Sequence, residues 1–322
     1  MTSVYAQDEP AAITEQSSTK DLVLKGDAEC TSCHDEEDSP MQLAIGKTRH
    51  GTIADSRAPT CTSCHGPSET HIQKLKGQTD RDKPDVTFGG MYAKIDEEAQ
   101  VDRYFGRFGK GTNTPVAERN APCLECHSDG RRIHWAGSTH ANRDVACTNC
   151  HQIHTSHDRV RDRQNQTELC FTCHKEQRAQ INRPSHHPIP EGKMACSDCH
   201  NVHGDNPKQL VKTSVNETCF ICHMEKRGPF LHNHQPVTED CSICHQPHGT
   251  TTANLLKYRP PYLCQECHSH SSHPGQLAGL PDGRTTSTSN LGSVARGCLN
   301  CHTNIHGGNS TQNSPTAGRF RR

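Results

Sequence analysis

Cysteine and histidine recur at one fixed spacing along this chain of 322 residues. All 20 cysteines fall into C-x-x-C pairs, which makes ten pairs, and a histidine follows each pair immediately. C-x-x-C-H is the attachment signature of c-type haem. In such a site the two cysteines form thioether bonds to the porphyrin, and the adjacent histidine binds the iron as an axial ligand. The pattern therefore predicts ten covalent haems.

Each motif contributes two cofactor-binding cysteines and one iron-ligating histidine, and no residue is assigned a catalytic role. The cysteines are Cys30, Cys33, Cys61, Cys64, Cys123, Cys126, Cys147, Cys150, Cys170, Cys173, Cys196, Cys199, Cys219, Cys222, Cys241, Cys244, Cys264, Cys267, Cys298 and Cys301. The motif histidines are His34, His65, His127, His151, His174, His200, His223, His245, His268 and His302.

Structural zinc sites and disulfide frameworks are the other common uses of many cysteines. A zinc site pairs C-x-x-C with a second pair of ligands a dozen or more residues away. A disulfide framework needs an even number of cysteines, but it places no histidine at a fixed offset. Since every pair is followed by histidine and no cysteine is left over, the pattern favours haem over both alternatives.

A haem iron held by two histidines needs a second imidazole, and the chain has 15 histidines outside the motifs (25 minus ten). Ten of these recur at regular places, so the chain divides into five two-haem units with two extra histidines each. Five follow every second motif closely: His71, His154, His203, His248 and His306. Five lie between the two motifs of a unit: His50, His140, His187, His234 and His273. The remaining five are His134, His157, His186, His232 and His270, of which His186 competes with His187 and His270 with His273.

The elements that position these residues are expected to be short. Only 30% of the residues are hydrophobic and 4% aromatic, which is little for a polypeptide core. The strings "ACTNCHQIH" (146–154), "ACSDCHNVH" (195–203) and "DCSICHQPH" (240–248) form a repeat whose unit is a haem pair. The predicted fold class is a multihaem cytochrome c with little regular secondary structure, in which short α-helices and long loops surround an extended chain of ten haems.

Other segments carry weaker signals. Residues 94–108 could form a short amphipathic helix at the surface, within the longest haem-free stretch, 73–122. Arg178 and Arg227 occupy matching repeat positions, where they could neutralise haem propionates or simply face solvent. With a formal net charge of −1, nothing indicates nucleic-acid binding.

The cellular location of the protein follows from the chemistry of haem attachment, which takes place outside the cytoplasm and requires an exported precursor. The string "SVYAQDE" (3–9) resembles the end of a signal peptide, so we expect residues 1–28 to be a signal-peptide remnant and a flexible N-terminus. Residues 307–322 are expected to be a flexible C-terminal tail. No apolar run of about 18 residues is present, so no transmembrane helix is expected in this chain.

The strings "CTSCHGPSETH", "SVNETCFICHMEKRGP" and "PVTEDCSICHQPHG" resemble the periplasmic decahaem cytochromes of the MtrA/MtoA/DmsE family. The resemblance runs from about residue 26 to 309, and the family's distal ligands map onto the same ten extra histidines. It implies two pentahaem halves, at 29–180 and 181–306. It further implies a periplasmic protein seated inside an outer-membrane β-barrel porin, with periplasmic cytochromes and a surface multihaem cytochrome or extracellular iron as partners. The segment 73–122 is longer than expected for the iron-reducing members.

The function implied by this resemblance is an electron conduit across the outer membrane, not an enzyme. The strings "LAIGKTRHG" (43–51) and "CTSCHG" (61–66) are closer to the ferrous-iron-oxidising members, so Fe(II) oxidation is favoured over Fe(III) reduction. A soluble periplasmic electron carrier or a filament-forming cytochrome has the same haem chemistry and is the main alternative. A multihaem reductase is a further alternative, but it needs an open iron site, and no C-x-x-C-K motif is present.

Overall fold

The computed structural model describes residues 27–51, 58–73, 81–88, 114–268, 298–300 and 302–311. The helix expected at 94–108 lies outside these residues, as do residues 1–26 and 312–322. The described α-helices are α1 (Ala28–Thr31), α2 (Pro40–Leu43), α3 (Cys61–His65), α4 (Glu69–Ile72), α6 (Val116–Cys126), α7 (Arg163–Phe171), α8 (Lys175–Ile181), α9 (Val215–Cys219), α10 (Gln235–Glu239) and α11 (Tyr262–Gln265).

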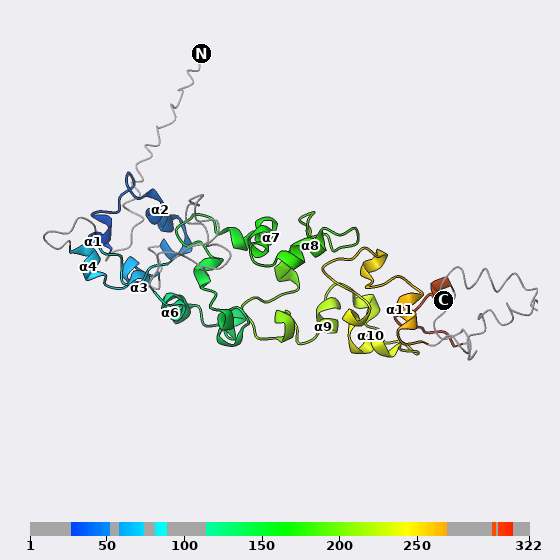
Figure 1. The fold of residues 1–322 in the computed structure, drawn as a ribbon. Helices are drawn as coiled ribbons and strands as arrows, with labels where there is room; N and C mark the ends of the chain where they lie inside the picture. Colours follow the sequence, from blue (N-terminus) through cyan, green and yellow to red (C-terminus); the bar gives the residue numbers. More distant parts are fainter. Residues whose placement is uncertain are drawn as a thin grey trace, which may run out of the picture. The chain divides into compact units, whose positions relative to one another are not determined.

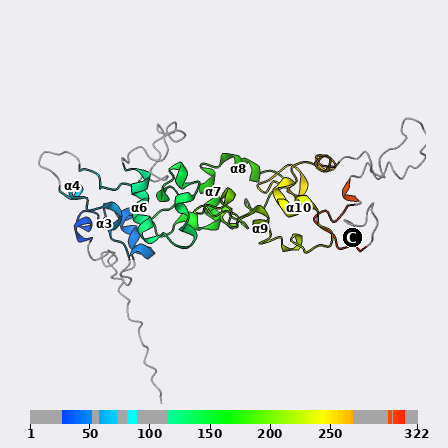
Figure 2. The same ribbon diagram turned by 90° about the horizontal axis from the view of Figure 1, so that it is seen from below.

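Short 3-10 helices complete the regular structure. They are η2 (Ala44–Lys47), η3 (Arg49–Gly51), η5 (Gly130–Arg132), η6 (Trp135–Gly137), η7 (Ala141–Arg143), η8 (Cys147–Asn149), η9 (Arg159–Arg161), η10 (Cys196–Asp198), η11 (Pro207–Gln209), η12 (Met224–Lys226), η13 (Cys241–Ile243), η14 (Ala253–Leu255) and η15 (Cys298–Asn300). Within the described ranges β-structure is limited to isolated bridges, such as Ser185 with Thr250. Long loops join these elements (Figures 1 and 2).

Each C-x-x-C-H motif forms a turn of helix, which explains why the elements are short. The backbone N–H of His127 donates to the carbonyl oxygen of Cys123 at 2.8 Å, and that of His174 donates to Cys170 at 3.0 Å. Residues three and four apart on such a turn lie on the same face. The turn therefore presents both cysteines and the histidine of a motif to one side, as attachment to a single porphyrin requires.

The apolar core of the described residues is very small. The buried hydrophobic side chains among them are those of Ala146, Leu169, Phe171, Ile181, Ala195 and Leu210. So few buried side chains cannot provide the hydrophobic burial that normally stabilises a chain of this length. The prediction of short helices and long loops with little regular secondary structure is confirmed.

The chain divides into two compact units. The first comprises Met1–His127 and Asp144–Arg159, and the second comprises Ser128–Arg143 and Val160–Arg322. Helices α3 and α6 lie side by side within the first unit in both views (Figures 1 and 2). The division into pentahaem halves at residues 29–180 and 181–306 stays a prediction.

None of the helices in the described part of the chain is both long enough and apolar enough to cross a membrane.

Candidate functional site

The first cysteines of successive motifs meet in couples. In each of the five two-haem units, the side chain of the first motif's leading cysteine lies next to that of the second motif's leading cysteine. The five couples are Cys30 with Cys61, Cys123 with Cys147, Cys170 with Cys196, Cys219 with Cys241, and Cys264 with Cys298. This contact brings the attachment points of two successive haems together within every unit.

The imidazole rings also meet in pairs. Eight motif histidines each lie opposite a histidine from outside the motifs, with ring centres 5.9 to 6.4 Å apart. The pairs are His34 with His71, His65 with His154, His127 with His50, His174 with His140, His200 with His248, His223 with His187, His245 with His306, and His268 with His234. All eight outer histidines belong to the set that the repeat predicted.

This ring separation fits an iron between two imidazoles. A metal–nitrogen bond is about 2 Å long, and the ring centre lies about 1 Å beyond the nitrogen, so two opposed ligands have centres about 6 Å apart. Rings in direct stacking contact can approach more closely, with centroids from about 4.5 Å apart. The ring-centre separations of the eight pairs match this value.

Backbone carbonyl groups fix the orientation of many of these rings. Nδ1 of His65 donates to the carbonyl oxygen of Val86 at 2.9 Å, and Nδ1 of His187 donates to that of Pro247 at 2.8 Å. The rings of His71, His140, His154, His200 and His245 make the same kind of bond. A carbonyl oxygen can only accept, so Nδ1 carries the proton and Nε2 keeps its lone pair. This arrangement is typical of metal-binding histidines.

Two of the carbonyl acceptors lie in unusual backbone turns. His200 Nδ1 donates to Lys208 O at 3.1 Å, and His245 Nδ1 donates to Asn254 O at 2.9 Å. Lys208 and Asn254 have φ angles of 56° and 60°, in the left-handed region. Residues other than glycine adopt this region at a cost in free energy and concentrate at functional sites. The repeated turn therefore serves to orient the preceding imidazole.

Burial favours the uncharged form of several paired imidazoles. Desolvation lowers the pKa of His65, of His245 and of His248, and it outweighs the hydrogen bond to Val86, which raises the pKa of His65. An uncharged imidazole is the form that ligates a metal.

Asp158 gives one motif histidine a carboxylate acceptor in place of a carbonyl group. Its Oδ2 lies 2.7 Å from Nδ1 of His151, and the same carboxylate accepts the backbone N–H of Gln152. A carboxylate on the far ring nitrogen orients a ligating imidazole and raises its basicity. No pattern in the sequence indicates the role of Asp158.

Arg119 in α6 is buried, with 4% of its surface exposed. Its Nε and Nη1 atoms have no hydrogen-bond partner among the described residues, and burial lowers the pKa of its guanidinium group. A buried guanidinium without an acceptor is costly, and a haem propionate is an acceptor of the right charge. Sequence reasoning missed Arg119 because an arginine in a short polar helix has no distinguishing pattern. Arg227 lies 3.9 Å from Glu217, so its contact with a propionate stays a prediction, like that of Arg178.

Three of the leftover histidines make other side-chain contacts. His186 lies 3.1 Å from Glu191, His134 lies 3.4 Å from Asp205, and Nε2 of His232 donates to the carbonyl oxygen of Ser310. Of these two neighbours, His187 lies opposite a motif histidine and His186 contacts Glu191, which favours His187 as the ligand.

Iron ligation by each of the ten outer histidines, His203 and His273 included, stays a prediction. The ring of His203 lies 5.9 Å from that of Trp135. His273 lies outside the described residues, as do His270 and Cys301.

Methionine variants of His187 and of its sequence neighbour His186 test which of the two histidines binds an iron. His187→Met is expected to raise the reduction potential of one haem by on the order of 0.1 V, because methionine ligation favours the ferrous state. His186→Met is expected to leave the potentials unchanged, because His186 faces Glu191. A spectroelectrochemical titration of both variants measures this. Identical titration curves for the two variants would exclude His187 as a ligand.

Comparison with known proteins gives three matches. A family model described as "Doubled CXXCH motif" matches residues 186–228 and 234–273, and a model described as "Cytochrome c-type protein NrfB-like" matches residues 93–166. The chain is 40% identical over 290 residues to "Multiheme cytochrome MtrA" of Shewanella baltica (strain OS185), which covers 88% of this chain and 79% of that relative. All three matches include C-x-x-C-H motifs, and haem c is therefore the group that these motifs bind.

Proposed function

Because the chain belongs to the MtrA family of multihaem c-type cytochromes, as the sequence predicted, we propose that it conducts electrons across the outer membrane inside a β-barrel porin. In this proposal the chain carries ten haems, each with its iron between two histidines. The observation that supports it most is the set of eight imidazole pairs with ring centres 5.9 to 6.4 Å apart.

The imidazole pairs connect each two-haem unit to the next. His50 lies between the two motifs of the first unit, yet its ring faces His127 in the second. His187 in the third unit likewise faces His223 in the fourth. A haem held by such a pair is attached to one unit and ligated from its neighbour. This interlocking supports a continuous array of haems.

Bound haem supplies reversible one-electron chemistry, between ferric and ferrous iron. The protein's residues determine where that chemistry is available. The cysteine couples hold two attachment points together, the carbonyl acceptors would leave Nε2 free to bind the iron, and Arg119 would bind a propionate. Two imidazoles per iron leave no position for a substrate, so we propose an electron-transfer protein without catalytic residues.

An array of this kind suits transfer across a membrane. A bilayer with its headgroups is about 40–45 Å thick, too far for one direct electron transfer between two centres. Successive haems divide this distance into short steps. We propose that the exported protein resides in the periplasm, associated with the outer membrane inside the porin. Its partners would be periplasmic cytochromes on one side and a surface multihaem cytochrome or extracellular iron on the other. Fe(II) oxidation is favoured over Fe(III) reduction because of the sequence at 43–51 and 61–66.

Association with the porin separates a conduit from a soluble carrier. The purified holoprotein and its cognate porin are expected to elute as one complex in size-exclusion chromatography in detergent, with haem absorbance in the porin peak. An unrelated outer-membrane barrel of similar size is the control, and no complex is expected with it. Separate elution of the protein and its cognate porin would instead support the soluble-carrier alternative.

A further inference from the structure

One buried polar position recurs in the cysteine couples. It lies three residues before the leading cysteine of a unit, and its side chain binds the leading cysteine of the unit's second motif. Asp27 accepts the backbone N–H of Cys61 at 2.8 Å, Asn120 accepts that of Cys147 at 2.9 Å, and Asn216 accepts that of Cys241 at 2.7 Å. These three side chains belong to residues 1%, 6% and 8% exposed, respectively.

Thr167 occupies the same position in the third unit. It is also buried, and its side chain lies next to that of Cys196. In four of the five units, the residue at this position therefore links the two motifs. It is Asp in the first unit, Asn in the second and fourth, and Thr in the third.

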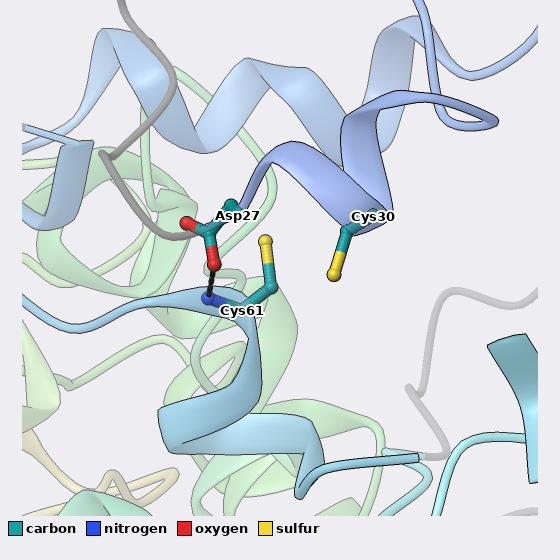
Figure 3. A group of neighbouring side chains, drawn as sticks. All are labelled: Asp27, Cys30 and Cys61. Atoms are coloured by element: carbon teal, nitrogen blue, oxygen red, sulfur yellow. Dashed lines mark hydrogen bonds between the residues drawn. The ribbon is translucent and has the colours of Figure 1, made fainter. Parts of the chain in front are cut away.

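The side chains of Asp27, Asn120 and Asn216 have almost the same shape, but only that of Asp27 can ionise. Figure 3 shows its carboxyl group beside the sulfur atoms of Cys30 and Cys61, and the three potential ligand atoms lie within 4.8 Å of one another. A carboxylate and two thiols could bind a metal ion in another setting. Both cysteines here belong to C-x-x-C-H motifs, however, so their sulfur atoms are taken up by thioether bonds. The carboxyl group instead adjoins the attachment points of two haems.

The charge of Asp27 acts on both sulfur atoms. After burial, it is the next largest influence that raises the pKa of the Cys30 thiol and of the Cys61 thiol, the latter to about 12. A buried charge is screened by salt far less than a charge at the surface. Its field is therefore felt by whatever group is bonded to these sulfur atoms.

We propose that Asp27 is a positioning residue that also lowers the reduction potentials of the haems attached at Cys30 and Cys61. The inference rests on the proposed function, because it requires those two haems. Reduction adds one electron to a ferric haem and removes one positive charge. A nearby carboxylate stabilises the ferric form more, so the electron is held less tightly. Asn120 and Asn216 make the same hydrogen bond without the charge. The haems attached at Cys30 and Cys61 thus gain a potential difference from those attached at Cys123 and Cys147 through one side chain.

The test uses two isosteric exchanges in the full-length holoprotein. Asp27→Asn keeps the hydrogen bond and removes the charge. It is expected to raise the potentials of at most two haems, by about tenfold in the ferrous-to-ferric ratio at a fixed applied potential, or about 59 mV for a one-electron couple. Asn120→Asp is the reciprocal variant, and it is expected to lower the reduction potentials of the haems attached at Cys123 and Cys147. Spectroelectrochemical titration at neutral pH measures both shifts.

Haem content, measured by mass spectrometry, distinguishes a failure of the role proposed for Asp27 from a failure of the proposed function. If wild-type protein and Asp27→Asn both carry ten haems and their titration curves coincide, the role of Asp27 is refuted while the proposed function stands. If the wild-type protein lacks haem at Cys30 or Cys61, the proposed function itself fails. Should Asp27→Asn not fold, Asn120→Asp still decides, because an unchanged titration curve in that variant contradicts the effect of a carboxylate at this position.

Discussion

The holoprotein is expected to exceed its polypeptide chain by ten haem masses in denaturing mass spectrometry. Thioether bonds survive denaturation, so every attached haem stays with the chain. The expectation follows from 20 cysteines that form ten C-x-x-C-H motifs and from five couples of leading cysteines that bring the attachment points together. Fewer than nine haems at full occupancy would contradict it.

A motif variant provides the internal control for this count. Replacing Cys219 and Cys222 by alanine is expected to remove one haem mass and leave nine. The control matters because partial loading of the wild-type protein gives a distribution of masses, whereas the variant shifts the upper limit of that distribution by one haem. An unchanged upper limit would show that the C-x-x-C-H motif at 219–223 holds no haem.

The haem motifs and the fold class could be predicted from the sequence because both depend on local spacing. A C-x-x-C-H string closes one helical turn by itself, as His127 and Cys123 do. A chain with 4% aromatic residues also offers few side chains for a polypeptide core. Local chemistry therefore determines both features before any long-range contact forms.

The pairing of the outer histidines with particular motif histidines could not be predicted from the sequence. His71 follows the motif of His65 closely, but its ring faces His34, while His65 faces His154. Regular spacing marks a histidine as a candidate ligand. It does not say which iron the ring meets, because the loops cross from one two-haem unit to the next.

The roles of the buried polar residues around the haem sites could also not be predicted from the sequence. Asp27 and Arg119 belong to no motif, and a charged residue in a polar chain is ordinarily exposed. Their importance becomes apparent from burial, from the bond between Asp27 and the Cys61 N–H, and from the Arg119 nitrogens that have no acceptor among the described residues. Such features depend on packing against distant segments.

Loss of one haem from the middle of the array is expected to interrupt conduction. In liposomes that contain the porin and the protein, the Cys219→Ala and Cys222→Ala double variant should reduce electron transfer by at least about tenfold. One missing centre lengthens a single step, and transfer slows steeply with distance. The remaining haems should still be reduced readily in solution by small redox partners, which serves as the control for folding and loading.

Electron transfer across a sealed membrane tests the conduit directly. Liposomes containing the cognate porin and the wild-type protein, with a reduced dye inside and ferric iron outside, are expected to show rapid oxidation of the dye. Liposomes with porin alone provide the baseline, because the barrel itself carries no redox centre. The account predicts transfer far above that baseline, in the direction that the potentials favour. Equal rates with and without the protein would contradict it.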